Sequence, residues 1–167
     1  INIEYMGFID DKLYVLAQVS LAAYDAAPGE LLWENTDEDD VFDYMLYEAS
    51  QLEDYAPGQI LVMTSVPSAR ILDANTGETL QEFLLDDYRV SDYPISVSNF
   101  ELSPDKRRLG ICIYEGMDEN YVGMLDLQTG SFSISEDSCR FICDIIWFDD
   151  DHFAAASYNL SDFESDD

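Results

Sequence analysis

Acid–base or nucleophilic chemistry in this chain of 167 residues would depend on one histidine, His152. A Ser-His-Asp triad or a Cys-His pair would have to use it. The sequence has no Gly-x-Ser-x-Gly elbow, however, and three aspartates stand directly before the histidine. A histidine after such an acidic run is typical of an exposed turn. We therefore predict no catalytic residue and interpret His152 as a side chain at the solvent edge.

Two acidic runs, 37–40 and 149–151, are the candidate cation sites. Calcium prefers several oxygen ligands, and neither run has the Asp-x-Asp-x-Asp-Gly spacing of a calcium loop. Cys139, Cys143 and His152 would leave a zinc site one ligand short. Glycine-rich loops for phosphate are also missing from the sequence. We expect solvated loop charge here, with no bound metal and no cofactor.

The charge of the chain restricts its partners. With 36 acidic and 7 basic side chains, the formal net charge is −29. Nucleic acids and anionic membrane surfaces are recognised by clustered Lys and Arg, so both classes of partner are excluded. The sequence contains no run of 18 apolar residues, so we predict no membrane insertion by this segment. A protein partner, of basic character, fits this charge.

The three cysteines, which include Cys112, are too few for a disulfide scaffold. We interpret them as buried free thiols, which leans toward a cytoplasmic location and leaves an extracellular one open. The chain begins without Met, on strand-like sequence, and ends in the acidic stretch 161–167. We expect it to be a piece of a longer protein.

One turn pattern recurs three times, and we expect it to position the strands on either side of it. An apolar run ends in Asp, Gly follows four residues later, and a second apolar run begins; the three aspartates are about 50 residues apart. An Asp can accept N–H groups across its own turn, and Gly supplies a positive φ. We predict a structural role, and not a binding role, for the six residues Asp25, Gly29, Asp73, Gly77, Asp126 and Gly130.

Short apolar runs of strand length separate these turns, so we predict an all-β fold of four-stranded antiparallel sheets. The expected units are 1–36, 41–86 and 95–136, followed by an incomplete unit at 139–160. Acidic connectors at 35–40 and 86–94 join them. The segment 41–50 fits a strand or a short helix, and we assign a strand by analogy with the first unit. The strands that we expect are 3–9, 13–17, 20–24, 30–34, 59–65, 69–72, 78–85, 95–102, 108–114, 121–125, 131–135, 143–148 and 152–157.

The run Ser103-Pro104-Asp105-Lys106 before a strand, together with the 73–77 turn, resembles the WD-repeat-like β-propellers of bacteria. Residues 23–33, with Gly29 and then Trp33, are more similar to the quinoprotein repeat. Gln81 and Ile134 replace that Trp in the next two units, and the Trp-Asp and Gly-His dipeptides of eukaryotic WD repeats are missing. The resemblance implies about three and a half blades of a partial β-propeller. An open β-sandwich or an all-β meander that is not divided into blades is the alternative.

The resemblance also implies a function. We expect a non-catalytic module for protein interaction or ligand sensing, part of a larger bacterial protein, and not an enzyme. The alternative is a segment of an enzyme propeller, a quinoprotein dehydrogenase or a glycoside-active one, with its site completed by other blades. About three and a half blades form only part of a closed propeller, so the resemblance also suggests self-association, in which two such half-rings pair. We expect function to lie where the units differ, in the two connectors. Tyrosines in or after these connectors would form a partner-binding rim or pack between blades; they are Tyr44, Tyr47, Tyr55, Tyr88 and Tyr93.

Overall fold

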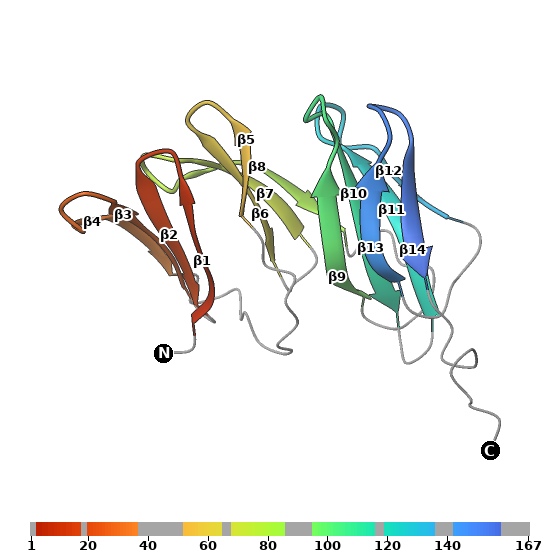
Figure 1. The fold of residues 1–167 in the computed structure, drawn as a ribbon, viewed down its shortest axis with the longest axis horizontal. Coiled ribbons are helices and arrows are strands. Elements are labelled where there is room, and N and C mark those ends of the chain that lie inside the picture. Colours follow the sequence, from red (N-terminus) through yellow and green to blue (C-terminus); the bar gives the residue numbers. More distant parts are fainter. Residues whose placement is uncertain are drawn as a thin grey trace, which may run out of the picture. The chain divides into compact units, whose positions relative to one another are not determined.

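The computed structural model describes residues 3–17, 20–36, 52–64, 68–85, 95–115, 119–135 and 142–157. All regular elements within these ranges are β-strands joined into antiparallel sheets (Figure 1). The chain divides into two compact units, Ile1–Asp86 and Asp87–Asp167. Within the described ranges, no helix is long and apolar enough to cross a membrane.

The first unit contains two four-stranded sheets in which sequential strands are neighbours. The strands of the first sheet are β1 (Ile3–Ile9), β2 (Lys12–Ala17), β3 (Ser20–Asp25) and β4 (Leu31–Thr36). Those of the second sheet are β5 (Leu52–Ala56), β6 (Gln59–Thr64), β7 (Ser68–Asp73) and β8 (Thr79–Leu84). The pairing register is equivalent in the two sheets, with Lys12 opposite Asp25 and Gln59 opposite Asp73.

The second unit contains a third sheet of four strands and a sheet of two strands. The third sheet consists of β9 (Ile95–Leu102), β10 (Arg108–Glu115), β11 (Glu119–Asp126) and β12 (Phe132–Ile134). The two-stranded sheet pairs β13 (Ile142–Trp147) with β14 (Phe153–Ser157). The predicted all-β class of four-stranded antiparallel sheets is therefore confirmed.

The expected strand at 41–50 lies outside the described residues. Among the described residues, the first strand of the second sheet is Leu52–Ala56. The reason is the tight turn at Pro57-Gly58, where Gly58 has a φ of +74° and closes the β5–β6 hairpin. A strand paired through such a turn has to abut it. The runs 37–40, 86–94 and 161–167 and residue Cys139 also lie outside the described residues.

The recurring turns share one set of backbone bonds. In the turn at 73–77, the Asp73 N–H donates to the Glu78 carbonyl at 2.9 Å, and the Gly77 N–H donates to the Asp73 carbonyl at 2.8 Å. Equivalent bonds occur in the turns at 25–29 and 126–130. The three glycines have φ values of +70°, +74° and +72°. Each aspartate also accepts a backbone N–H on its own Oδ1, so its carboxylate is used within the turn.

The core of the first unit lies between its two sheets. Trp33 of β4 covers the 73–77 turn of the second sheet, and its Nε1 donates to the Ala74 carbonyl at 3.1 Å. A Cβ on Gly77 would lie 2.5 Å from the indole, so only glycine fits under the ring. The other members of this core are Tyr14, Leu16, Leu21, Ala23, Ile60, Val62 and Leu72.

The core of the second unit joins β10 to the two-stranded sheet. A Cβ on Gly110 would lie 3.2 Å from Ile145, so the two strands approach closely. Trp147 donates from Nε1 to the Glu101 carbonyl at 3.0 Å, and its ring lies 4.9 Å from that of Phe153. These contacts hold β13 and β14 against the third sheet.

Candidate binding site

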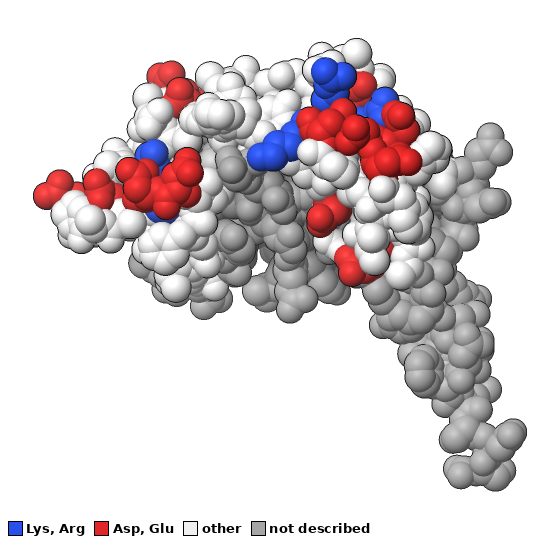
Figure 2. Space-filling model, turned by 45° about the horizontal axis from the view of Figure 1, so that its top comes forward, with Lys and Arg blue, Asp and Glu red and all other residues white. Residues whose placement is uncertain are grey.

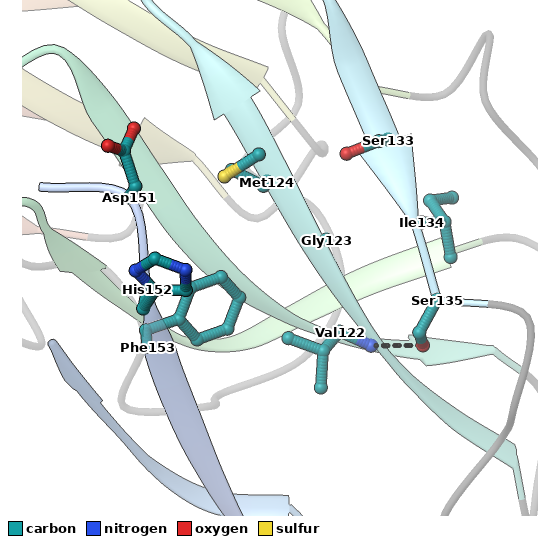
Figure 3. Close-up of a pocket in the computed structure, with 9 residues that line it drawn as sticks. All are labelled: Val122, Gly123, Met124, Ser133, Ile134, Ser135, Asp151, His152 and Phe153. Carbon is teal, nitrogen blue, oxygen red and sulfur yellow. Dashed lines mark hydrogen bonds between the residues drawn. The ribbon is translucent and has the colours of Figure 1, made fainter. Parts of the chain in front are cut away.

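A hollow of about 380 Å³ opens in the second unit between the third sheet and the two-stranded sheet. Its lining comes from β11, β12 and the start of β14, as Figure 3 shows. Met124, Ile134 and Phe153 supply apolar surface, and Asp151 and His152 supply polar groups. The remaining lining residues are Val122, Gly123, Ser133 and Ser135.

The floor of the hollow is fixed by the pairing of β11 with β12. The Val122 N–H donates to Ser135 Oγ at 3.2 Å, and the Ser135 N–H donates to the Val122 carbonyl at 2.8 Å. A Cβ on Gly123 would lie 2.5 Å from the ring of Phe132, so glycine lets this ring lie across the strand. The backbone under the hollow is thus held from both strands.

The rim of the hollow is the turn between β13 and β14. Asp149 Oδ1 accepts the backbone N–H of Asp151 at 2.9 Å and that of His152 at 2.8 Å, and it lies 2.9 Å from His152 Nδ1. The Asp151 N–H, followed by the His152 side chain, lowers the pKa of Asp149. The side chain of His152 is 75% exposed, as predicted. The Asp149 carboxylate thus holds both the backbone of the turn and the imidazole of His152.

Arg108 of β10 ties this rim to the third sheet. Its Nη1 donates to the Asp151 carboxylate and, at 2.7 Å, to the Asp150 carbonyl. The bond to Asp151 raises the pKa of Arg108. Figure 2 shows basic side chains beside acidic ones on the face that it draws. In the first unit, Arg70 Nε lies 2.7 Å from Glu82 Oε1. The rim therefore keeps an acidic character despite the arginine.

The structure does not bring the residues of the sequence-based hypotheses into one site. Asp25 and Asp73 are in the first unit, Asp126 is in the second, and each carboxylate serves its own turn. Cys112 is buried in β10 and is in no disulfide. Across the described ranges, no three His, Cys, Asp or Glu side chains gather in a way that could hold a metal ion.

The hollow was missed in the sequence, although one signal pointed to it. Ile134 stands eight residues after Asp126, the repeat position that Trp33 occupies after Asp25. Trp33 fills the space against the neighbouring sheet, whereas the smaller Ile134 lines an open hollow. The smaller Ile134 in place of a tryptophan was the available sign, although Gln81 of the second unit shares this replacement.

No protein-family model and no curated protein matches the sequence. Among solved structures, a europium-containing methanol dehydrogenase matches with a TM-score of 0.56 at 19% identity, over 79% of this chain and 24% of that one. BamB from Moraxella catarrhalis matches with a TM-score of 0.58 at 13% identity, over 77% and 38%. The WD40 domain of Neurospora crassa Pan2 matches with a TM-score of 0.55 at 19% identity, over 86% and 38%.

The sheets are β-propeller blades. The chain spans well under half of the length of each of these three structures. At such low identity, these matches show a shared fold and nothing more. The predicted likeness to quinoprotein and WD-type propellers is confirmed at the level of the fold. In this fold, neighbouring blades meet face to face, which explains why a hollow forms between two blades of the second unit.

Proposed function

We propose that this propeller segment is a non-catalytic binding module that recognises a protein partner at the hollow beside His152. The observation that carries the proposal is the juxtaposition of Met124, Ile134 and Phe153 with the acidic rim at 149–151. Binding sites typically combine an apolar concavity with a few polar groups that orient the ligand. The hollow fits an apolar side chain of the partner, flanked by Lys or Arg.

The charge of the chain supports a basic partner. A net charge of −29 attracts cationic surfaces over a distance and speeds their encounter. At the rim, Asp150 is exposed, and the bond from Arg108 goes to its backbone carbonyl and not to its carboxylate. The rim would then contribute mainly to the association rate and its salt dependence, and the apolar hollow to the lifetime of the complex.

A peptide array tests this proposal. Peptides with Leu, Met or Phe next to Lys or Arg are screened, and the best binder is measured by fluorescence polarisation. We expect Ile134→Glu to weaken binding at least about 10-fold, because it places a charge among apolar lining atoms. Asp150→Asn should mainly slow association at low salt. The control is Leu84→Gln, an exposed apolar residue of the first unit. Equal affinity of the Ile134→Glu and Leu84→Gln variants would contradict the proposal.

The alternative function, a segment of an enzyme propeller, makes a different prediction. A site for calcium and a quinone cofactor would raise the melting temperature when both are added, because a ligand that binds only the folded state stabilises it. The binding module gives no such shift. Thermal unfolding with and without calcium and quinone distinguishes the two functions.

Self-association of half-rings is a further prediction for the same chain. Light scattering across a concentration series measures it directly. A dimer would add a second copy to the protein partners proposed here, and a monomer at all concentrations would remove it.

A further inference from the structure

The imidazole of His152 keeps one nitrogen available at the hollow. His152 Nδ1 lies 2.9 Å from Asp149 Oδ1 and 3.1 Å from Asp149 Oδ2. An ionised carboxylate only accepts hydrogen bonds, so this contact assigns the proton of the neutral ring to Nδ1. Nε2 is then the acceptor of the ring. Within the part of the chain that the structure describes, the hydrogen bonds to the ring go to Nδ1 and none goes to Nε2.

Apolar side chains line the same hollow as this acceptor. Met124 of β11, Ile134 of β12 and Phe153 of β14 share the lining with His152 (Figure 3). All three apolar residues are partly buried. Phe153 directly follows His152, and its ring lies 4.9 Å from that of Trp147, so the wall beside the imidazole is held in place. The hollow therefore combines apolar surface with one hydrogen-bond acceptor at its rim.

Charged groups reach the imidazole from its own turn and from β10. Asp149 binds the ring, Asp150 is exposed on the same turn, and Asp151 pairs with Arg108 of β10. The lining residues from β11 and β12 carry no ionisable side chain. Histidine is the side chain that ordinarily changes its charge between about pH 5 and 8. A change of charge at this rim near neutral pH is therefore a change at His152.

We propose that the hollow takes a tyrosine side chain of the protein partner, whose phenol O–H donates to His152 Nε2. This inference rests on the binding function proposed above and names the anchor residue. Tyrosine offers both an apolar ring for the lining and a donor for the acceptor at the rim. Phenylalanine would fill the same space but leave Nε2 without a partner once water is displaced, which costs affinity.

Lysine and arginine fit the rim better than the hollow itself. Either would carry its charge in among Met124, Ile134 and Phe153, and an unpaired charge is unfavourable in apolar surroundings. Beside the anchor, the same basic side chains meet the exposed Asp150. The expected recognition segment is therefore a tyrosine with Lys or Arg next to it.

Protonation of His152 removes the acceptor. The imidazolium ring carries an N–H on both nitrogens, so Nε2 can then only donate. The preference for tyrosine over phenylalanine should be present while His152 is neutral, and it should be lost as the pH falls through the titration of this histidine. The positive charge that the rim gains acts on both anchors alike and cancels in the ratio of their affinities.

Nitrogen-15 magnetic resonance of the natural chain tests the acceptor. The sequence contains a single histidine, so every imidazole signal belongs to His152. We expect the chemical shifts of the neutral ring to show a protonated Nδ1 and an unprotonated Nε2. A neutral ring that carries its proton on Nε2 would contradict the proposal.

Two small molecules then test the hollow without any peptide. p-Cresol is the side chain of tyrosine, and toluene is that of phenylalanine. With neutral His152, we expect p-cresol to bind about 5-fold more tightly than toluene, the usual contribution of one hydrogen bond, and to shift the His152 Nε2 resonance. His152→Ala and acidification should each abolish this preference, and Leu84→Gln, in the first unit, should keep it. Absence of the preference, or its survival in His152→Ala, would overturn the inference.

The best peptide from the array gives the second measurement. Its apolar anchor is replaced by Tyr and by Phe, and the Tyr peptide should bind about 5-fold more tightly while His152 is neutral, but equally in acid. Equal affinities at both pH values would refute the tyrosine anchor and leave the binding function intact, provided that Ile134→Glu still weakens both peptides. An array without any binder would instead remove the binding function, and p-cresol would still decide whether the hollow accepts a phenol.

Discussion

The contact between Trp33 and Gly77 leads to the sharpest prediction. Trp33 is 8% exposed, and a Cβ on Gly77 would lie 2.5 Å from its ring. We expect Trp33→Ala to lower the free energy of unfolding by about 3–5 kcal/mol, the usual cost of removing a buried indole. Gly77→Ala should cost about 1–2 kcal/mol for a left-handed residue with a Cβ. Collision with the ring should add about 1–3 kcal/mol.

The double variant separates the two parts of the glycine effect. Without the indole, Gly77→Ala retains its backbone strain but loses the collision, so the combined cost should be about 1–3 kcal/mol less than the sum. Gly29→Ala is the matched control, because Gly29 has a similar φ of +70° and open space above it. It should cost only the strain, about 1–2 kcal/mol.

Urea unfolding followed by circular dichroism measures these free energies. Trp147, in the second unit, is the remaining tryptophan of the Trp33→Ala variants, so its fluorescence reports that unit separately. Hydrogen exchange then localises the loss of stability to the first unit. If Gly77→Ala costs no more than Gly29→Ala, or if the double variant is additive, the indole does not lie on this glycine and the reasoning fails.

Three further outcomes test the electrostatics. The backbone N–H of Thr129 lowers the pKa of Asp126, so the ionised carboxylate stabilises the folded state at pH values above its unfolded pKa. Asp126→Asn should therefore lower the melting temperature at pH 7. This loss should disappear once the pH falls below the lowered pKa of Asp126. Burial raises the pKa of Glu101, so ionisation of this carboxyl destabilises the folded state as the pH rises. Glu101→Gln should therefore raise the melting temperature at pH 7, and this gain should be lost at acidic pH, where Glu101 is protonated. Arg108→Met removes the bonds to the Asp150 carbonyl and the Asp151 carboxylate. Exchange of the amides in the 149–152 turn should then accelerate, as nuclear magnetic resonance would show.

Local chemistry explains why the strands could be predicted. Asp and Gly four residues apart specify a turn whatever lies around it, and the apolar runs on either side become its paired strands. The segment 41–50 carries no such signal, whereas Pro57-Gly58 does. A strand ending at that turn, β5, follows from the turn more directly than from analogy with another unit.

The sites were harder to predict because they depend on stacking between sheets. Trp33 is a visible feature of the repeat, but nothing near it in the sequence indicates that its partner is Gly77. The hollow beside His152 joins residues from β11, β12 and β14, and its volume depends on the size of Ile134 relative to a tryptophan. Such distances follow only from the register and packing of whole sheets.

The bond from Trp33 has a consequence for how such chains evolve. The acceptor is the main-chain carbonyl of Ala74, which Tyr14 also approaches at 3.4 Å, and the surface under the indole is a glycine. A contact between sheets that depends on a backbone carbonyl and a glycine places few demands on the side chains of the sheet that receives the indole. Sheets of this kind can therefore be duplicated, exchanged or allowed to diverge while the joint between them is kept.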